Sequence, residues 1–372
     1  MKSFKNGDEK ISVNELMIAI PSMVIGVGIL SLPRVIAVET IGSDGWIALA
    51  IAGIATVLMV WLMAKLAASF PHQPFFSYAS LIVSKPVAKV MTFIFAILFI
   101  GVAAYDIRVL GHTSQQYLFD HTPVEVVSLS FLLVVVYAVA GSRAGLFRLN
   151  MLFLPLIIFI LLFVLVVNLK WIDVSNLLPV FKTDIKGYLK AVHTSSLSYI
   201  GISIVLFYMA FVDRPHKAPK AAMIGMSIPI ILYILGYLFC IMVFGHAATS
   251  HLLFPTIDLA KRVELPGAIL ERIEAVFFVV WTMGVFTTTV MAFDIAILAL
   301  RSVFKRIKKM TLVLFLSPTM YYLSMVPNDS SQITIFGDIL GNITVIFSFT
   351  TTIVLIVIAK IRGVGSNDKK TK

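Results

Sequence analysis

The chain has 372 residues, of which 59% are hydrophobic and 13% are charged, and its mean hydropathy is +0.98. Because an ordinary soluble domain carries about 25% charged residues, this composition excludes a soluble enzyme and indicates a polytopic membrane protein. The net charge of +11 follows from membrane topology, since cytoplasmic loops collect Lys and Arg, and it does not indicate a nucleic-acid partner.

Ten apolar stretches occur along the chain, each of about the length needed to cross the hydrocarbon core as a helix. In chain order, as spans 1 to 10, they cover residues 14–33, 45–66, 88–119, 124–141, 149–169, 191–212, 220–245, 274–300, 310–327 and 338–360. The sequence therefore predicts an all-α polytopic membrane protein with ten transmembrane helices in the lipid bilayer.

The distribution of charge predicts how these spans are oriented. With the tails 1–13 and 361–372 in the cytoplasm, the inner loops and tails hold 21 of the 30 Lys and Arg residues. We expect a single integral membrane domain over residues 1–372, in which a ten-helix bundle occupies 14–360. Residues 246–273 carry charges and prolines, and are expected to form an outward-facing interfacial loop with a short amphipathic helix.

Glycines interrupt two of the spans near their middle. Gly26 and Gly28 lie in span 1, and Gly201 lies in span 6 between Ser198 and Ser203. Such residues allow a helix to unwind at a ligand site, or they allow close helix packing. Because the two spans are five apart, the pattern predicts a transporter-like fold of two inverted 5+5 repeats with broken helices 1 and 6.

Four segments carry a resemblance to a known family. They read IGVGILSLPR at 25–34, DGW at 44–46, YDIR at 105–108 and LERIEAVFFVVW at 270–281. Together they resemble the B subunit of spore germinant receptors, within the amino acid–polyamine–organocation transporter superfamily. The resemblance implies a sensor that binds a small nutrient and works with partner subunits A and C. It also implies the spore inner membrane, with both termini on the core side.

The expected ligand-binding residues lie at the two breaks, with one residue each from spans 3 and 8. They are Ile25, Gly26, Val27, Gly28, Val102, Ile200, Gly201 and Thr288. By the family pattern, the backbone amides of the span 1 break face the carboxylate of an amino-acid-like ligand, since helix N-termini carry partial positive charge. Some family members have an acidic residue just after the span 6 glycine, whereas this chain has Ser203.

Span 8 carries three consecutive hydroxyl groups, on Thr287, Thr288 and Thr289. The family pattern selects Thr288, which shares a helix face with Gly284. In the alternative interpretation, the hydroxyls bond only to carbonyls one turn earlier in their own helix.

Span 3 carries a polar stripe at helical spacing: Gly101, Tyr105, Arg108, His112 and Gln115. Ionisable residues within spans usually face the bundle interior, so residues of this kind are candidates for a gate or for ion coupling. The candidates are Tyr105, Asp106, Arg108 and Asp294. Alternatively, Arg108 is a structural anchor that reaches the outer interface, and Asp294 is a partner for a cytoplasmic-side Lys or Arg.

The remaining motifs indicate no metal site and no cofactor. The seven His residues are scattered, and Cys240 is expected to be a small buried hydrophobic residue. The leading hypothesis is a nutrient sensor, and the alternative is an ion-coupled secondary amino acid transporter. A scaffold without a ligand is the third class. No acidic residue stands beside Gly26 or Gly201 in the sequence, which argues against ion coupling.

Overall fold

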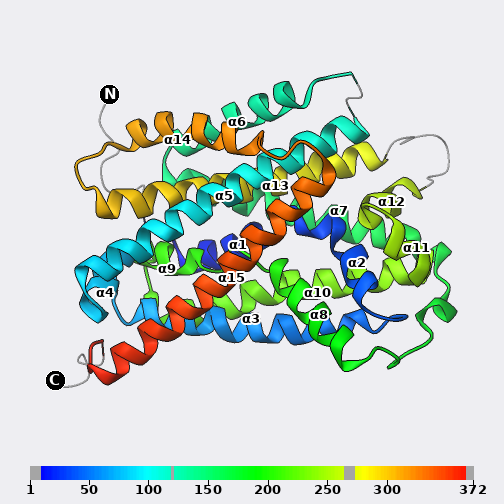
Figure 1. Cartoon of the computed structure of the whole chain (residues 1–372), viewed down its shortest axis with the longest axis horizontal. Helices are drawn as coiled ribbons and strands as arrows, with labels where there is room; N and C mark the ends of the chain where they lie inside the picture. The colour runs from blue at the N-terminus through cyan, green and yellow to red at the C-terminus, as the bar shows by residue number, and fades with distance from the viewer. Residues whose placement is uncertain (1–9, 119–120, 264–272, 366–372) are drawn as a thin grey trace.

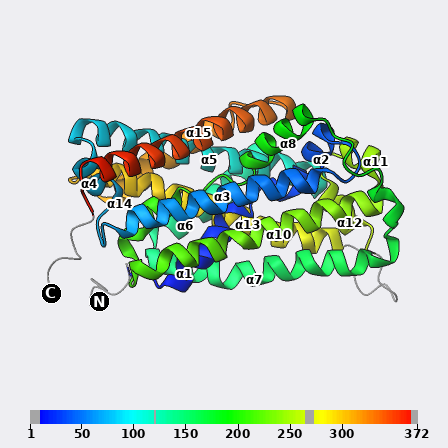
Figure 2. The same ribbon diagram turned by 90° about the horizontal axis from the view of Figure 1, so that it is seen from below.

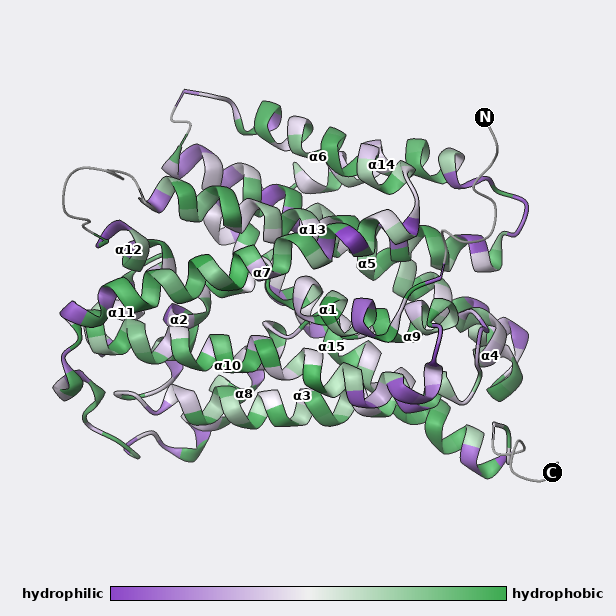
Figure 3. Ribbon diagram, turned by 180° about the vertical axis from the view of Figure 1, so that it is seen from behind, coloured by the Kyte–Doolittle hydropathy of each residue, from purple (hydrophilic) through white to green (hydrophobic). Residues whose placement is uncertain are grey.

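The computed structural model describes residues 10–118, 121–263 and 273–365. Its long helices run side by side along the long axis of the molecule (Figure 1). Hydrophobic residues follow the helices, and hydrophilic residues gather toward the two ends of the bundle and in the connecting segments (Figure 3). This distribution fits helices that cross a bilayer.

The α-helices begin and end as follows: α1 Val13–Val24, α2 Gly28–Glu39, α3 Gly45–Ala68, α4 Phe75–Ile82, α5 Lys85–Tyr117, α6 Val124–Ala140, α7 Arg143–Val167, α8 Ile185–Leu197, α9 Ile204–Tyr208, α10 Ala218–Phe244, α11 His246–His251, α12 Pro255–Lys261, α13 Ile273–Val303, α14 Lys309–Ser324 and α15 Ser330–Ile361. Short 3₁₀ helices connect some of them, at Asn168–Trp171, Val174–Leu177, Met209–Phe211 and Pro215–Lys217.

Among the described residues, six helical segments are long and apolar enough to cross a membrane, and the bent pair α1–α2 makes a seventh. The six segments contain α3, α5, α7, α10, α13 and α15. The all-α membrane class is therefore confirmed, while the number of ten spans stays a prediction. Helices α6 and α14 and the pair α8–α9 occupy the remaining predicted spans, but they are shorter.

Three helices begin at least six residues earlier than the apolar pattern predicts, because polar residues cap them. Helix α8 begins at Ile185 instead of 191, where the Asp184 carboxylate accepts a hydrogen bond from the Gly187 N–H at 2.9 Å. Helix α7 begins at Arg143 instead of 149, where the Ser142 hydroxyl accepts a hydrogen bond from the Gly145 N–H at 3.2 Å. Helix α15 begins at Ser330 instead of 338, where the Asp329 carboxylate caps its first turn. N-capping stabilises the start of a helix whether or not the residues there are apolar.

Helix α13 is the most enclosed of the spanning helices. In its most apolar stretch 83% of the residues are buried, against 33–50% in the other spans. It packs against α5, α7, α6 and α1 (Figures 1 and 2). The three consecutive threonines of α13 are buried there.

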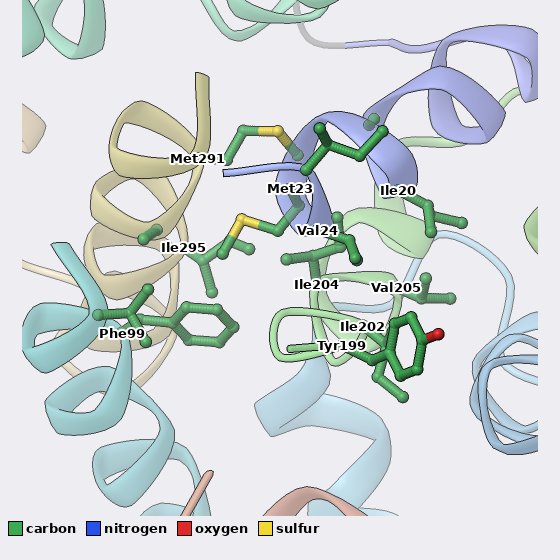
Figure 4. Packing of buried hydrophobic residues seen from close by; sticks show 14 of the residues in the cluster. Ile20, Met23, Val24, Phe99, Tyr199, Ile202, Ile204, Val205, Met291 and Ile295 are labelled. Carbon is green, nitrogen blue, oxygen red and sulfur yellow. The ribbon is translucent and has the colours of Figure 1, made fainter. Parts of the chain in front are cut away.

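One end of the bundle is closed by packed side chains. Met23, Phe99, Ile204 and Ile295 converge from α1, α5, α9 and α13 (Figure 4). Beside them the ring of Phe207 lies 4.9–6.1 Å, between centroids, from the rings of Phe75, Phe95 and Phe99. Helix α1 begins and α15 ends at this same end of the molecule (Figures 1 and 2). That placement fits an even number of spans.

The opposite end is covered by the segment after α10. It contains the short helices α11 and α12, and α12 packs against α2, α10 and α13. The predicted short helix in 246–273 is thus present, although its apolar residues are buried in the bundle. Residues 264–272, which include Glu271 and Arg272, lie outside the described residues.

Candidate ligand-binding site

A cavity of about 220 Å³ lies beside the break between α1 and α2. Helices α5, α8, α13 and α15 form its other walls, and its lining runs from Gly26 and Thr288 to Arg34, His112 and Ser330. Pockets for drug-sized ligands measure about 300–1,000 Å³, so this cavity suits a smaller molecule.

Helices α1 and α2 meet at 55°, with residues 25–27 outside both helices. The carbonyl groups around the break accept hydrogen bonds from buried side chains. Thr287 and Thr288 donate to Ser22 O, Tyr233 donates to Val24 O at 2.8 Å, Trp281 donates to Gly26 O at 3.2 Å, and Thr256 donates to Ile29 O at 2.8 Å. Backbone polar groups in lipid must be satisfied, so these side chains stabilise the break.

The amide groups at the break remain available. Among the described residues, none accepts a hydrogen bond from the N–H of Val27 or Gly28, and both residues line the cavity. They stand at the N-terminus of α2, where the helix dipole favours an anion. The predicted break of span 1 is therefore present, and its amides border the cavity.

The three threonines of α13 have different surroundings. All three hydroxyls bond to carbonyls of their own helix, as the alternative interpretation predicts. In addition, Thr287 and Thr288 reach Ser22 O across the break, while Thr289 donates to Asp106. Only Thr288 of the three lines the cavity.

The second break separates α8 from α9, over residues 198–203. Gly201 adopts φ +106°, a conformation that L side chains rarely take. Ser198 and Ile200 line the cavity beside the first break, whereas Gly201 is not among its lining residues and a Cβ there would meet Met23. Ile25 also lies outside the cavity wall, with its carbonyl toward Gly284. Both broken helices are confirmed, and Gly201 and Ile25 shape the backbone next to the cavity.

The polar stripe of α5 faces the N-terminal half of α15. A Cβ on Gly101 would meet Leu340, Tyr105 packs against Phe336, Arg108 donates to Asn328 O at 3.2 Å, and His112 lies 2.8 Å from Ser330 Oγ. Arg108 is 5% exposed and lies outside the cavity, as an anchor between helices would. Val102, Tyr105 and His112 do line the cavity.

Asp106 points to another side of α5, toward α13. It is 3% exposed, lines the cavity and accepts a hydrogen bond from Thr289 at 3.3 Å. No acidic residue stands beside Gly26 in the sequence, but the structure places Asp106 in the wall of the same cavity. Asp106 is far from Gly26 along the chain. Helix packing brings Asp106 to Thr289 and Gly26 to Thr288, which are consecutive residues of α13.

Asp294 is separate from the cavity. Its carboxylate accepts hydrogen bonds from Arg143 Nε at 2.9 Å and Nη2 at 3.4 Å, and from the Tyr208 hydroxyl at 3.2 Å. Both charged side chains are almost completely buried. Of the two predicted roles for Asp294, the structure favours that of an ion-pair partner, and the partner is Arg143.

Sequence reasoning did not select two charged residues of the cavity. Arg34, the last residue of the IGVGILSLPR segment, lines it from α2, and Asp338 lines it from α15. Asp338 lies eight residues after the start of an unexpectedly long helix, so the apolar pattern placed it at the edge of a span. Among the described residues, no group of three or more His, Cys, Asp or Glu side chains could hold a metal ion.

Outside the spans, Asp44 of the DGW segment clamps a loop before α8. Its carboxylate accepts hydrogen bonds from the N–H groups of Phe181, Lys182 and Thr183 at 2.5–2.9 Å. Partial burial by itself raises the pKa of the Asp44 carboxyl, but these donors lower it more, so its pKa lies below the usual 3.8.

The sequence matches a known protein family over most of its length. The family described as Spore germination protein matches residues 10–333. Spore germination protein GerLB of Bacillus cereus is 36% identical over 99% of both chains. Spore germination proteins YndE and A2 of Bacillus subtilis (strain 168) are 29% and 28% identical, covering 96% and 91% of this chain and 98% and 93% of their own.

Solved transporter structures share the fold. MhsT in complex with L-phenylalanine aligns with a TM-score of 0.65 at 13% identity, covering 92% of this chain and 97% of that chain. Mhp1, a nucleobase-cation-symport-1 family transporter in a closed conformation with bromovinylhydantoin bound, aligns with a TM-score of 0.68 at 13% identity, covering 91% and 78%. The predicted transporter-like fold is thereby confirmed.

Proposed function

This chain belongs to the spore germination protein family, and from that premise we propose that it is the nutrient-sensing membrane subunit of a germination receptor. The observation that carries the proposal is the cavity at the first helix break, where the N–H groups of Val27 and Gly28 are free to bind a ligand. The hypothesis of a scaffold without a ligand does not explain why so many side chains stabilise the break.

In the proposed complex, an amino-acid-like nutrient places its carboxylate at the N-terminus of α2. Val102 and Ile200 contact its apolar part, and the Thr288 hydroxyl lies at the inner end of the site. Gly26 allows the break to approach α13 closely, because a Cβ there would stand 2.7 Å from Thr288 Oγ1. Gly201 and Ile25 contribute indirectly, through the path of the two broken helices.

The nutrient acts by changing a conformational equilibrium. A ligand shifts such an equilibrium only by its different affinity for the two states. The cavity extends toward Arg34 and His112, while the other end of the bundle is closed around Phe207, so closure of the outer half on a ligand is the proposed response. Partner subunits A and C read that response in the spore inner membrane, with both termini of this chain on the core side.

The proposal is tested with spores that lack this gene and with the same spores carrying the wild-type gene. Germination is measured across amino acids, sugars and nucleosides. We expect the deletion to abolish the response to one nutrient or a narrow group, and the wild-type gene to restore it. An unchanged response to every nutrient, in spores without a redundant receptor, contradicts the proposal.

The second candidate function is ion-coupled transport of amino acids. It is favoured by one observation, the buried carboxylate of Asp106 beside the cavity, together with the fold shared with transporters. Purified chain in sealed vesicles distinguishes the two functions. Uptake of the germination nutrient driven by a proton or sodium gradient supports the transporter, and binding without uptake supports the sensor.

A further inference from the structure

The carboxylate of Asp106 has few partners for so buried a group. In the described part of the chain, the hydroxyl of Thr289 is its one hydrogen-bond donor, and no donor reaches its Oδ1 atom. No Lys, Arg or His nitrogen of those residues lies within 4.0 Å of it. A buried carboxylate without a counter-charge is costly in a low-dielectric interior, so this site favours a cation.

The neighbouring arginine does not supply that cation. Arg108 follows Asp106 by two residues, which places the two side chains on different sides of α5. Its guanidinium donates to Asn328 O and approaches the sulfur of Met325. A transition-metal ion is also disfavoured, because the described residues offer no cluster of three acidic, His or Cys ligands.

The position of Asp106 relative to the break is fixed by two consecutive residues of α13. Thr289 bonds to the carboxylate of Asp106, while Thr288 touches the break at Gly26. Asp106, Thr288, Val27 and Gly28 all line the same cavity. A negative group and the positive N-terminus of α2 therefore border one small space.

We propose that Asp106 binds the ammonium group of the nutrient, whose carboxylate lies at the amides of Val27 and Gly28. This inference rests on the proposed function, and it names the ligand class as a zwitterionic α-amino acid. An α-amino acid carries one positive and one negative group, so it offers a partner to each of these two poles. Uncharged sugars and nucleosides leave the carboxylate of Asp106 unpaired, so they are poor ligands of this cavity.

The experiment measures binding to the purified full-length chain in nanodiscs. Thermal stability is followed with each of the twenty amino acids, with glucose and with adenosine, and affinities are then titrated for the strongest amino acid and its α-hydroxy acid. Asp106→Asn removes the charge at nearly constant shape. Asp258→Asn is the matched control, because this carboxylate on α12 lies outside the cavity and faces Lys261 at 3.8 Å.

We expect the amino acid to bind the wild type at least tenfold more tightly than its α-hydroxy acid. Asp106→Asn should weaken amino acid binding tenfold or more and remove this preference, while Asp258→Asn leaves both unchanged. The wild-type comparison stands even if the Asn variant does not fold.

Three results would overturn the assignment of Asp106 while leaving a nutrient sensor in place. They are equal affinities for the amino acid and the hydroxy acid, normal binding by Asp106→Asn, and binding of glucose or adenosine only. Loss of binding in Asp338→Asn but not in Asp106→Asn would place the ammonium at α15 and overturn it as well. If no compound of the panel stabilises the protein, that result contradicts the proposed function itself.

Discussion

Gly26→Ala tests the close approach between the break and α13. An added Cβ would lie 2.7 Å from Thr288 Oγ1, 3.4 Å from its Cβ and 3.5 Å from its Cγ2. The first distance is far inside van der Waals contact, and Thr288 is held by hydrogen bonds to carbonyls on both sides. Overpacking of this kind costs about 1–3 kcal/mol. The displaced segment also carries the amides proposed to bind the nutrient.

Gly28→Ala is the matched control on the same segment. Its Cβ would meet Ser198 at 3.5 Å or more, which is ordinary contact, so we expect a change in stability below about 0.5 kcal/mol. Replacing the clashing side chain provides a second control. Thr288→Ala should offset part of the cost of Gly26→Ala, because it removes the atom at 2.7 Å, and the two changes are then non-additive.

The assay combines membrane abundance, thermal unfolding of purified protein and the germination response of spores. We expect Gly26→Ala to lower the unfolding temperature and to abolish or strongly weaken the nutrient response, and Gly28→Ala to preserve stability. A Gly26→Ala protein with normal abundance, normal unfolding and a normal response would refute the steric argument. Additive effects of Gly26→Ala and Thr288→Ala would show that the clash with Thr288 is not the cause.

Arg143→Ala should destabilise the protein by about 3–5 kcal/mol in thermal unfolding, because it leaves Asp294 buried without its counter-charge. A double variant with leucine at positions 143 and 294 should lose much less stability. An equal loss of stability in the two variants would contradict the role of the ion pair. Thr288→Ala should raise the half-maximal nutrient concentration roughly two- to tenfold, for a hydrogen bond worth about 0.5–1.5 kcal/mol, while Thr287→Ala leaves the dose–response curve in place; the reverse order would mean that Thr287 contacts the ligand. The lowered pKa of Asp44 means that its carboxylate stabilises the fold above its unfolded pKa, and that this stability is lost as pH falls through the lower folded value. Asp44→Asn should therefore lower the unfolding temperature at neutral pH, and the unfolding temperature of this variant should decrease less below about pH 4 than that of the wild type. An unchanged pH profile would show that the hydrogen bonds to Asp44 do not stabilise the fold.

The sequence predicted the parts of this protein that depend on local pattern. Apolar runs located the long helices, and the glycines of spans 1 and 6 located both breaks. Of the three threonines of span 8, the family pattern selected Thr288, and Thr288 lines the cavity. Where capping decided the helix start, as at Ser142 and Asp329, the apolar pattern missed the boundary, because a cap is a hydrogen bond and not a hydrophobic signal.

The charged residues could be found in the sequence but not placed by it. Asp106 and Asp294 look alike as isolated acids in apolar spans. Helix packing gives Asp294 a bidentate arginine and leaves Asp106 facing the cavity. These partners lie more than a hundred residues away along the chain, so no spacing rule reaches them. Gly201 was identified as a break, yet Ile200 lines the cavity and Gly201 does not.

The central claim is that a small nutrient binds in the cavity beside the first break. Val102 lines this cavity from α5, whereas Ile97 on the same helix is 52% exposed on the outer face. The most direct measurement titrates the strongest-binding amino acid into purified wild type, Val102→Phe and Ile97→Phe. We expect at least a tenfold loss of affinity for Val102→Phe, which fills the cavity, and wild-type affinity for Ile97→Phe. Equal affinities in all three proteins would contradict it.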